Sequence, residues 1–206
     1  ADGEGIQILD VESMRSALEP CCSVGYFKAV SDLNLDQKGF NEEALIASIP
    51  VPGPSGQQSF FTGIKSIPQS AEPLIVATGN FGLALARESS PGGTLYRGMP
   101  SKDGETLQYG LALDVASVEG YDIAVVAALS GSRQVLMTVD VTNPLLPVVR
   151  SVREIVADGG VVDVLVNGTL VYVSTQKATT PASLGVEVFD ISELSTVAYL
   201  GRIDGV

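Results

Sequence analysis

The chain repeats itself at an interval of 49 residues, and this repeat restricts the folds that it can adopt more than any other feature of the sequence. The segment Gly110–Leu129 matches Gly159–Thr175, and the alignment places Asp114 on Asp163. Each segment consists of two apolar runs rich in β-branched residues, separated by a short turn. Both segments are therefore predicted to form β-hairpins.

The turns of these hairpins support the prediction. Asn167-Gly168 is the strongest short-range hairpin signal, because both residues tolerate the positive φ of a type I′ turn. Glu119-Gly120 takes the same place in the preceding unit and is a weaker form of that signal. The sequence Asn167-Gly168-Thr169 also has the form of an N-glycosylation sequon, but a tight turn accounts for it better.

Two more strands are predicted after each hairpin. The third ends in a similar phrase in both units, at Val135–Pro144 and at Gly185–Leu194. A fourth short apolar run follows, at 147–152 in one unit and at 196–203 in the other. Each unit is thus expected to contain four strands.

The same frame extends toward the N-terminus. Four strand-sized apolar runs lie between Phe61 and Met99, with Lys65 placed 49 positions before Asp114. The segment Gly5–Met14 matches the third strand of the last unit. The chain therefore divides into a half unit over residues 1–27, an insertion over 28–60, and whole units over 61–108, 109–158 and 159–206.

Four-stranded antiparallel units at this period, rich in Val, Ile, Leu and Gly, are typical of the blades of a β-propeller. The sequence predicts an all-β fold of about three and a half blades, with one short helix in the insertion between blades. A propeller usually closes with about four to eight blades, so the prediction includes remaining blades or other domains of a parent protein as partners.

The repeated phrase resembles the LVIVD repeat of bacterial and archaeal surface propellers. The resemblance rests on GIQILDVES, on VLMTVDVTNP followed by PVVRSV, and on GVEVFDIS followed by VAYLGRI, and it spans about two-thirds of the chain. It fades in the unit from Phe61 to Met99, where Ala86 replaces the aspartate. The resemblance implies an extracellular, cell-surface or periplasmic propeller with an adhesive or scaffolding role, and does not imply an enzyme.

Composition excludes several other classes. The 24 acidic and 12 basic residues give a net charge of −12, which disfavours nucleic acid and anionic membranes as partners. No apolar run reaches the roughly 18 residues of a membrane span, so membrane insertion is not expected. The absence of His removes the Ser-His-Asp triad and imidazole metal sites. Adjacent Cys21 and Cys22 are interpreted as packed thiols, with a redox or vicinal-disulfide role as the alternative.

Loop lengths indicate which face of such a propeller binds a partner. Loops between the second and third strands, and connections between blades, share one face. The long segments fall on that face, at Lys28–Phe60, Met99–Tyr109 and Gln176–Leu184, whereas the opposite loops are short. Binding usually resides on long loops of a rigid scaffold, so the long-loop face is predicted to bind protein or carbohydrate.

The insertion contains a candidate calcium loop. Asp32, Asn34, Asp36 and Glu43 occupy positions 1, 3, 5 and 12 of an EF-hand or dockerin-like loop, which supplies the hard oxygens that Ca²⁺ requires. Gln37 stands where glycine would permit the sharp turn, which departs from the motif. The alternative is an Asx-rich loop that leads into a helix, with Asn41 as N-cap and 44–49 as the helix body.

Aspartates recur at two places in the repeat. Asp114 and Asp163 lie on first strands, where they either line a central channel or, in the preferred interpretation, pair with backbone or water. Asp10, Asp140 and Asp190 are interpreted as turn formers that accept hydrogen bonds from the backbone that follows.

These observations predict a non-catalytic binding or scaffolding propeller. One alternative is a propeller hydrolase or quinoprotein-like enzyme that uses calcium or a cofactor at the central channel. Another is a structural segment of a surface polymer. No catalytic residue is assigned, because the chain contains no nucleophile elbow, phosphate loop or cysteine metal cluster.

Overall fold

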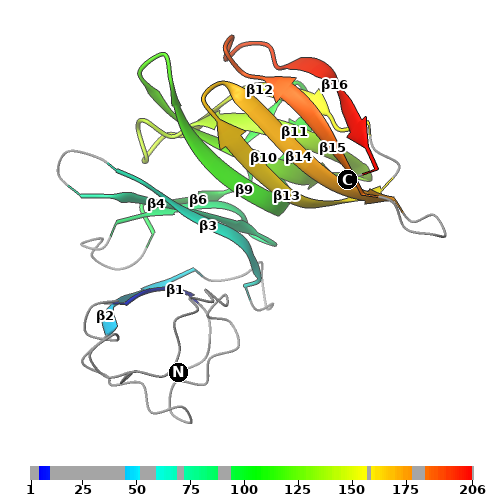
Figure 1. Ribbon diagram of the computed structural model, residues 1–206. Coiled ribbons are helices and arrows are strands. Elements are labelled where there is room, and N and C mark those ends of the chain that lie inside the picture. Colours follow the sequence, from blue (N-terminus) through cyan, green and yellow to red (C-terminus); the bar gives the residue numbers. More distant parts are fainter. Residues whose placement is uncertain are drawn as a thin grey trace, which may run out of the picture.

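The computed structural model describes residues 5–9, 45–51, 59–68, 72–87, 94–156, 159–177 and 184–205 (Figure 1). Within these ranges every regular element is a β-strand. The strands form three four-stranded antiparallel sheets and two two-stranded ones. The predicted all-β fold with four-stranded antiparallel units is confirmed at this level.

The three large sheets coincide with the three repeats found in the sequence. The first sheet contains β3 (Phe61–Ile67), β4 (Leu74–Gly79), β5 (Gly82–Ala86) and β6 (Tyr96–Gly98). The middle sheet contains β9 (Tyr109–Val118), β10 (Tyr121–Ser130), β11 (Arg133–Asp140) and β12 (Val148–Glu154). The last sheet contains β13 (Gly159–Asn167), β14 (Leu170–Lys177), β15 (Leu184–Asp190) and β16 (Ala198–Asp204). In each sheet the strands pair in chain order, which is the arrangement that short turns between neighbours produce.

The predicted helix over 44–49 is wrong. Residues Leu45–Pro50 form strand β2, which pairs antiparallel with β1 (Gly5–Leu9). A helix this short would form few backbone hydrogen bonds, too few to offset the free-energy cost of helix nucleation. The run also contains two β-branched isoleucines, and pairing with β1 satisfies backbone groups of both segments.

The hairpin turns partly follow the predicted chemistry. Glu119 and Gly120 have φ values of 53° and 82°, as a type I′ turn between paired Val118 and Tyr121 requires. The second turn lies one residue later than predicted, because Asn167 pairs with Leu170 inside the ladder. Only Gly168, with φ of 63°, is then left-handed, which matches a type II′ turn with glycine at its first central position.

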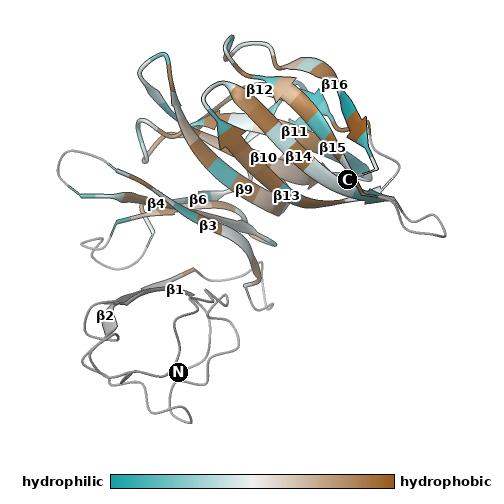
Figure 2. Cartoon of the chain, viewed as in Figure 1, coloured by the Kyte–Doolittle hydropathy of each residue, from teal (hydrophilic) through white to brown (hydrophobic). Residues whose placement is uncertain are grey.

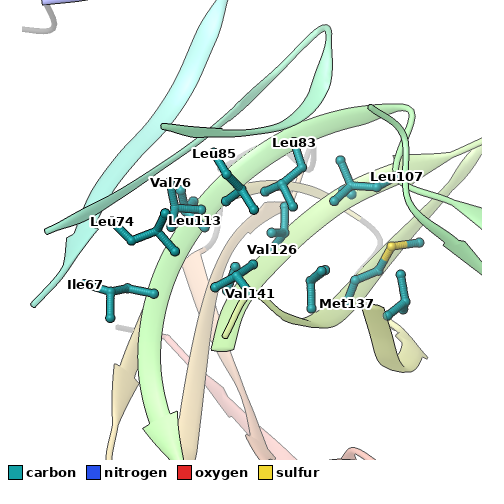
Figure 3. Close-up of a cluster of buried hydrophobic side chains, with 14 of the residues drawn as sticks. Ile67, Leu74, Val76, Leu83, Leu85, Leu107, Leu113, Val126, Met137 and Val141 are labelled. Carbon is teal, nitrogen blue, oxygen red and sulfur yellow. The ribbon is translucent and has the colours of Figure 1, made fainter. Parts of the chain in front are cut away.

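The large sheets stack face to face in chain order, and hydrophobic residues concentrate along their strands (Figures 1 and 2). Between the first and middle sheets lie Val76, Leu85, Leu113, Val126 and Met137 among others (Figure 3). Between the middle and last sheets lies a second set of buried residues, which includes Ile123, Val125, Leu136, Val173 and Phe189. The middle sheet is therefore buried on both faces, and for that reason β10 reads as a continuous apolar run from 123 to 128.

The first strands of the three sheets, β3, β9 and β13, lie beside one another. Thr62 Oγ1 donates a hydrogen bond to the Gly110 carbonyl at 2.7 Å across the first seam. Glycine is required at 110, since a Cβ there would lie 1.8 Å from Thr78 Oγ1. At this glycine β9 of the middle sheet therefore closely approaches β4 of the first sheet.

The connections between sheets and the β10–β11 turn share one end of the stack, which we call the connection end. Gln134 donates from Nε2 to the Gly159 carbonyl at 2.9 Å and accepts from the Val161 N–H at 3.1 Å. Gln108 Oε1 accepts from the Gly131 N–H at 3.1 Å in the same way. The long connection Met99–Tyr109 lies at this end, as expected, but so do the two-residue turns between β4 and β5 and between β10 and β11. The other two predicted long segments lie largely outside the described residues.

Candidate functional site

The residues of the predicted calcium loop, Asp32, Asn34, Asp36 and Glu43, lie outside the described residues, as do Cys21 and Cys22. The calcium site therefore stays a prediction. Within the described ranges, no group of three or more His, Cys, Asp or Glu side chains is placed to hold a metal ion.

Asp114 links all three large sheets instead of lining an open channel. Its carboxylate lies 3.2 Å from Lys65 Nζ on the first sheet and accepts a hydrogen bond from the Val166 N–H on the last sheet at 2.7 Å. The preferred interpretation, pairing with the backbone, is confirmed for this residue. Lys65, which occupies the aligned position of the preceding unit, is the partner that the sequence did not reveal.

Asp163 has different surroundings from Asp114. Its side chain is exposed, and its Oδ1 accepts a hydrogen bond from the N–H of the adjacent Val164 at 2.8 Å. Both aspartates thus pair with backbone groups, but only Asp114 does so across a seam between sheets.

The aspartates at the ends of third strands form turns, as predicted. Asp140 Oδ1 accepts from the Thr142 N–H at 3.0 Å, and Asp190 Oδ1 accepts from the Ser192 N–H at 2.8 Å. The backbone hydrogen bond from Ser192 lowers the pKa of Asp190. Asp10 lies outside the described residues.

Asp140 also holds the residue around which the candidate site is built. Arg150 Nε and Nη2 both donate to Asp140 Oδ2, at 3.1 and 2.5 Å. Burial raises the pKa of the Asp140 carboxyl, but the hydrogen bonds from Thr142 and Arg150 outweigh burial and leave its pKa below the usual value. The hydrogen bond to Asp140 in turn raises the pKa of the Arg150 guanidinium.

The opposite side of the Arg150 guanidinium is held by an aromatic ring. Its central carbon lies 4.8 Å from the centroid of the Tyr121 ring, within the range of a cation–π interaction. Lys102 Nζ donates to the Arg150 carbonyl from a third element, the hairpin of β7 (Ser101–Lys102) and β8 (Glu105–Thr106). The Arg150 side chain is therefore held by Asp140 and Tyr121, and its backbone by Lys102.

The hairpin that carries Lys102 is part of the predicted long connection Met99–Tyr109. Asp103 and Gly104 have φ values of 54° and 82°, as a type I′ turn requires. Leu107 is fully buried, and the Thr106 N–H donates to Ser130 Oγ at 2.9 Å. The connection is thus an ordered hairpin attached to the middle sheet.

These groups border a surface hollow of about 380 Å³ between the middle and last sheets. Its volume lies within the range of small-ligand sites, about 300–1,000 Å³. The hollow is lined by Lys102, Glu119, Tyr121, Val148, Val149, Arg150, Glu193, Leu194 and Ser195.

Two exposed leucines lie close to the hollow in sequence. Leu145 and Leu146 are 66% and 68% exposed on the β11–β12 turn, which leads into Val148 of the hollow. We call the hollow together with these two leucines the Arg150 surface. The sequence prediction assigned a structural role to the short turns and so missed this surface. The leucine pair between Pro144 and Pro147, apolar residues inside a turn, was the available signal.

A buried ionic cluster on the last sheet anchors the connection from the middle sheet. Glu187 is fully buried, and its Oε2 accepts from the Val156 N–H at 3.2 Å. Arg202 Nη1 lies 3.3 Å from Glu187 Oε1 and 3.2 Å from Thr175 Oγ1. The hydrogen bond from Arg202 to Asp204 raises the pKa of the guanidinium. This cluster is internal to the stack and serves to hold it together.

The scan of protein-family models finds no match to this chain, and the search of curated proteins finds none. Among the described residues no helix is long and apolar enough to cross a membrane.

Proposed function

We propose that the chain is a non-catalytic binding or scaffolding module built from β-propeller blades. Three features support the propeller interpretation: four-stranded sheets that pair in chain order, face-to-face stacking, and first strands that lie side by side. The resemblance to the LVIVD repeat supports an extracellular, cell-surface or periplasmic location.

The Arg150 surface carries the proposed binding function. Arg and Tyr are among the residue types most enriched in energetic hot spots of protein interfaces, and here Arg150 stacks on Tyr121 in a preformed arrangement. Little side-chain entropy is then lost when a partner binds. Lys102, which also lines the hollow, belongs to the connection Met99–Tyr109, one of the long segments that the sequence predicts to bind.

A protein segment fits this surface better than a carbohydrate. The exposed aliphatic side chains of Leu145 and Leu146 present no hydrogen-bonding group to sugar hydroxyls, whereas they can bury apolar side chains of a protein. Within the hollow, Lys102 and Arg150 stand beside Glu119 and Glu193, so that charges of both signs are available to orient such a segment. We therefore propose a protein partner that contributes apolar residues flanked by charged ones.

The experiment selects ligands for the 206-residue chain from a displayed peptide library and probes a glycan array in parallel. The matched variants are Leu145→Ser/Leu146→Ser at the Arg150 surface and Leu184→Ser/Leu200→Ser elsewhere, each pair exchanging two exposed leucines. We expect the first pair to weaken peptide binding about tenfold or more, as hot-spot truncation does, and the second pair to leave it unchanged. Peptide binding that is insensitive to the first pair, or no selected peptide at all, would refute the proposal. Glycan binding lost in the first pair would assign carbohydrate instead.

A further inference from the structure

The last sheet has one face that carries an apolar cluster and is uncovered in the described structure. Cross-strand pairs place Leu165, Tyr172 and Val188 in one row on this face. The next row holds Val186 and Ile203 together with the polar Asp163 and Ser174. Leu165 and Ile203 are 57% and 54% exposed. We call this set of residues the open face.

The opposite face of the same sheet is buried. Val164, Val173 and Phe189 alternate with the residues of the open face along their strands and pack against the middle sheet. Apolar residues on both faces are typical of a sheet that is covered on both sides. An isolated end sheet would instead be expected to carry polar residues on its outer face.

The corresponding faces of the two preceding sheets show what covers such a face. On the first sheet, Val76 and Leu85 are fully buried under the middle sheet (Figure 3). On the middle sheet, Ile123, Val125 and Leu136 are fully buried under the last sheet. In both cases the cover is the next four-stranded sheet of the repeat.

An aspartate on the first strand also indicates where a covering sheet would lie. Asp114 on the middle sheet accepts the N–H of Val166, which belongs to the first strand of the covering sheet. Asp163 occupies the aligned position on the last sheet and is exposed. Its carboxylate lies where it would receive the N–H of a first strand placed beside β13.

We infer that the open face is the docking face for a further four-stranded antiparallel sheet of the same repeat, whose first strand runs beside β13 and donates a backbone N–H to Asp163. The inference rests on the stacking pattern that underlies the proposed propeller, and it is independent of binding at the Arg150 surface.

A second copy of this chain is a poorer occupant. In each seam, the covering sheet packs through the face that it turns toward the sheet before it in the chain. On the first sheet that face is already covered: Ala77, Phe81 and Ala84 are buried together with Val51. Among the described residues of the large sheets, a second copy therefore has no uncovered face of the required kind.

The test uses a fluorescent reporter, since the chain contains no Trp. Tyr172→Trp creates an open-face reporter, and Tyr121→Trp creates a matched middle-sheet reporter away from that face. Each is measured in the 206-residue chain and in a chain extended after Val206 by a second copy of residues 159–206. In the extended chain we expect the emission of the open-face reporter to shift to the blue and its quenching by acrylamide to fall several-fold. The middle-sheet reporter should be unchanged.

A further variant of the extended chain sharpens the result. Leu165→Glu/Val188→Glu is expected to restore the quenching of the open-face reporter, because it charges the face that the added sheet must cover. Unchanged quenching of that reporter on extension, or an added repeat that stays unfolded by circular dichroism, would overturn the inference. If quenching of the open-face reporter fell as the concentration of the 206-residue chain rose, the open face would be assigned to a second copy. That result would also overturn the inference. None of these readings depends on peptide binding, so this inference and the proposed function can fail separately.

Discussion

Replacing Arg150 by methionine tests how the candidate site is held together. Methionine keeps an apolar stem over Tyr121 but removes both hydrogen bonds to Asp140, a residue that is only 8% exposed. A hydrogen bond to a charged group contributes about 1.5–3 kcal/mol, and losing one partner of a fully buried pair costs about 3–5 kcal/mol. Because the Arg150 side chain is 37% exposed, water screens the pair, and we expect a loss of about 1–2 kcal/mol in the free energy of unfolding.

The same substitution is expected to change the pH dependence of stability. The folded-state pKa of Asp140 lies below its unfolded value, so its contribution is present above the unfolded pKa and is lost as pH falls through the folded pKa. Without Arg150 the folded pKa moves back toward the unfolded one. Acidification from about pH 7 to about pH 3 should therefore cost Arg150→Met less stability than it costs the parent chain.

The assay is urea denaturation followed by circular dichroism, applied to a double-mutant cycle. Asp140→Asn is the matched partner, because it removes the charge but retains an oxygen that can accept the Thr142 N–H. We expect a coupling free energy of about 1 kcal/mol between the two positions at neutral pH. A coupling near zero, or an identical acid dependence in the parent and Arg150→Met chains, would refute this account of the site.

Two further substitutions test the seam and the turn. Gly110→Ala should destabilise the protein strongly or prevent folding, because the new methyl group would meet Thr78 Oγ1. Gly160→Ala is the control, since the space around its Cβ is open. Equal stability of the two variants in thermal unfolding would contradict the close approach of β9 to β4. Glu119→Asn should raise the free energy of unfolding by a few tenths to about 1 kcal/mol, because asparagine tolerates the φ of 53° better in a type I′ turn before Gly120. A lower melting temperature of Glu119→Asn in the same assay would show that the turn geometry has been misassigned.

The strands of the three large sheets could be predicted from sequence because they are specified locally. Each apolar run of the repeat, such as the one that became β4, is bounded by turn residues a few positions away. Those short-range preferences recur in every unit, so one hairpin supports the assignment of the next. The turn formers Asp140 and Asp190 were predictable for the same reason, since each accepts a hydrogen bond from the backbone two residues later.

The sequence-based predictions are wrong where local propensities favour two structures about equally and pairing with a distant segment selects one of them. Residues 45–50 suit a short helix or a strand, and β1, about 40 positions earlier, selects the strand by pairing with it. Asn167-Gly168 marks a turn correctly, but the ladder with β14 sets its register one residue later. Such choices depend on which segments meet, and no short window of sequence contains that information.

The contacts around the candidate site likewise depend on which segments meet in the fold. The repeat identified Asp114 as a special position, but its partners Lys65 and Val166 come from two other sheets. Arg150 and Tyr121 line the same hollow as Glu193 only because the middle and last sheets stack. The number and order of the strands in the large sheets follow from the sequence alone, through turn chemistry and apolar runs that act between neighbouring residues. Which side chains share a surface follows only from the folded arrangement, because that depends on the faces that stack across the seams.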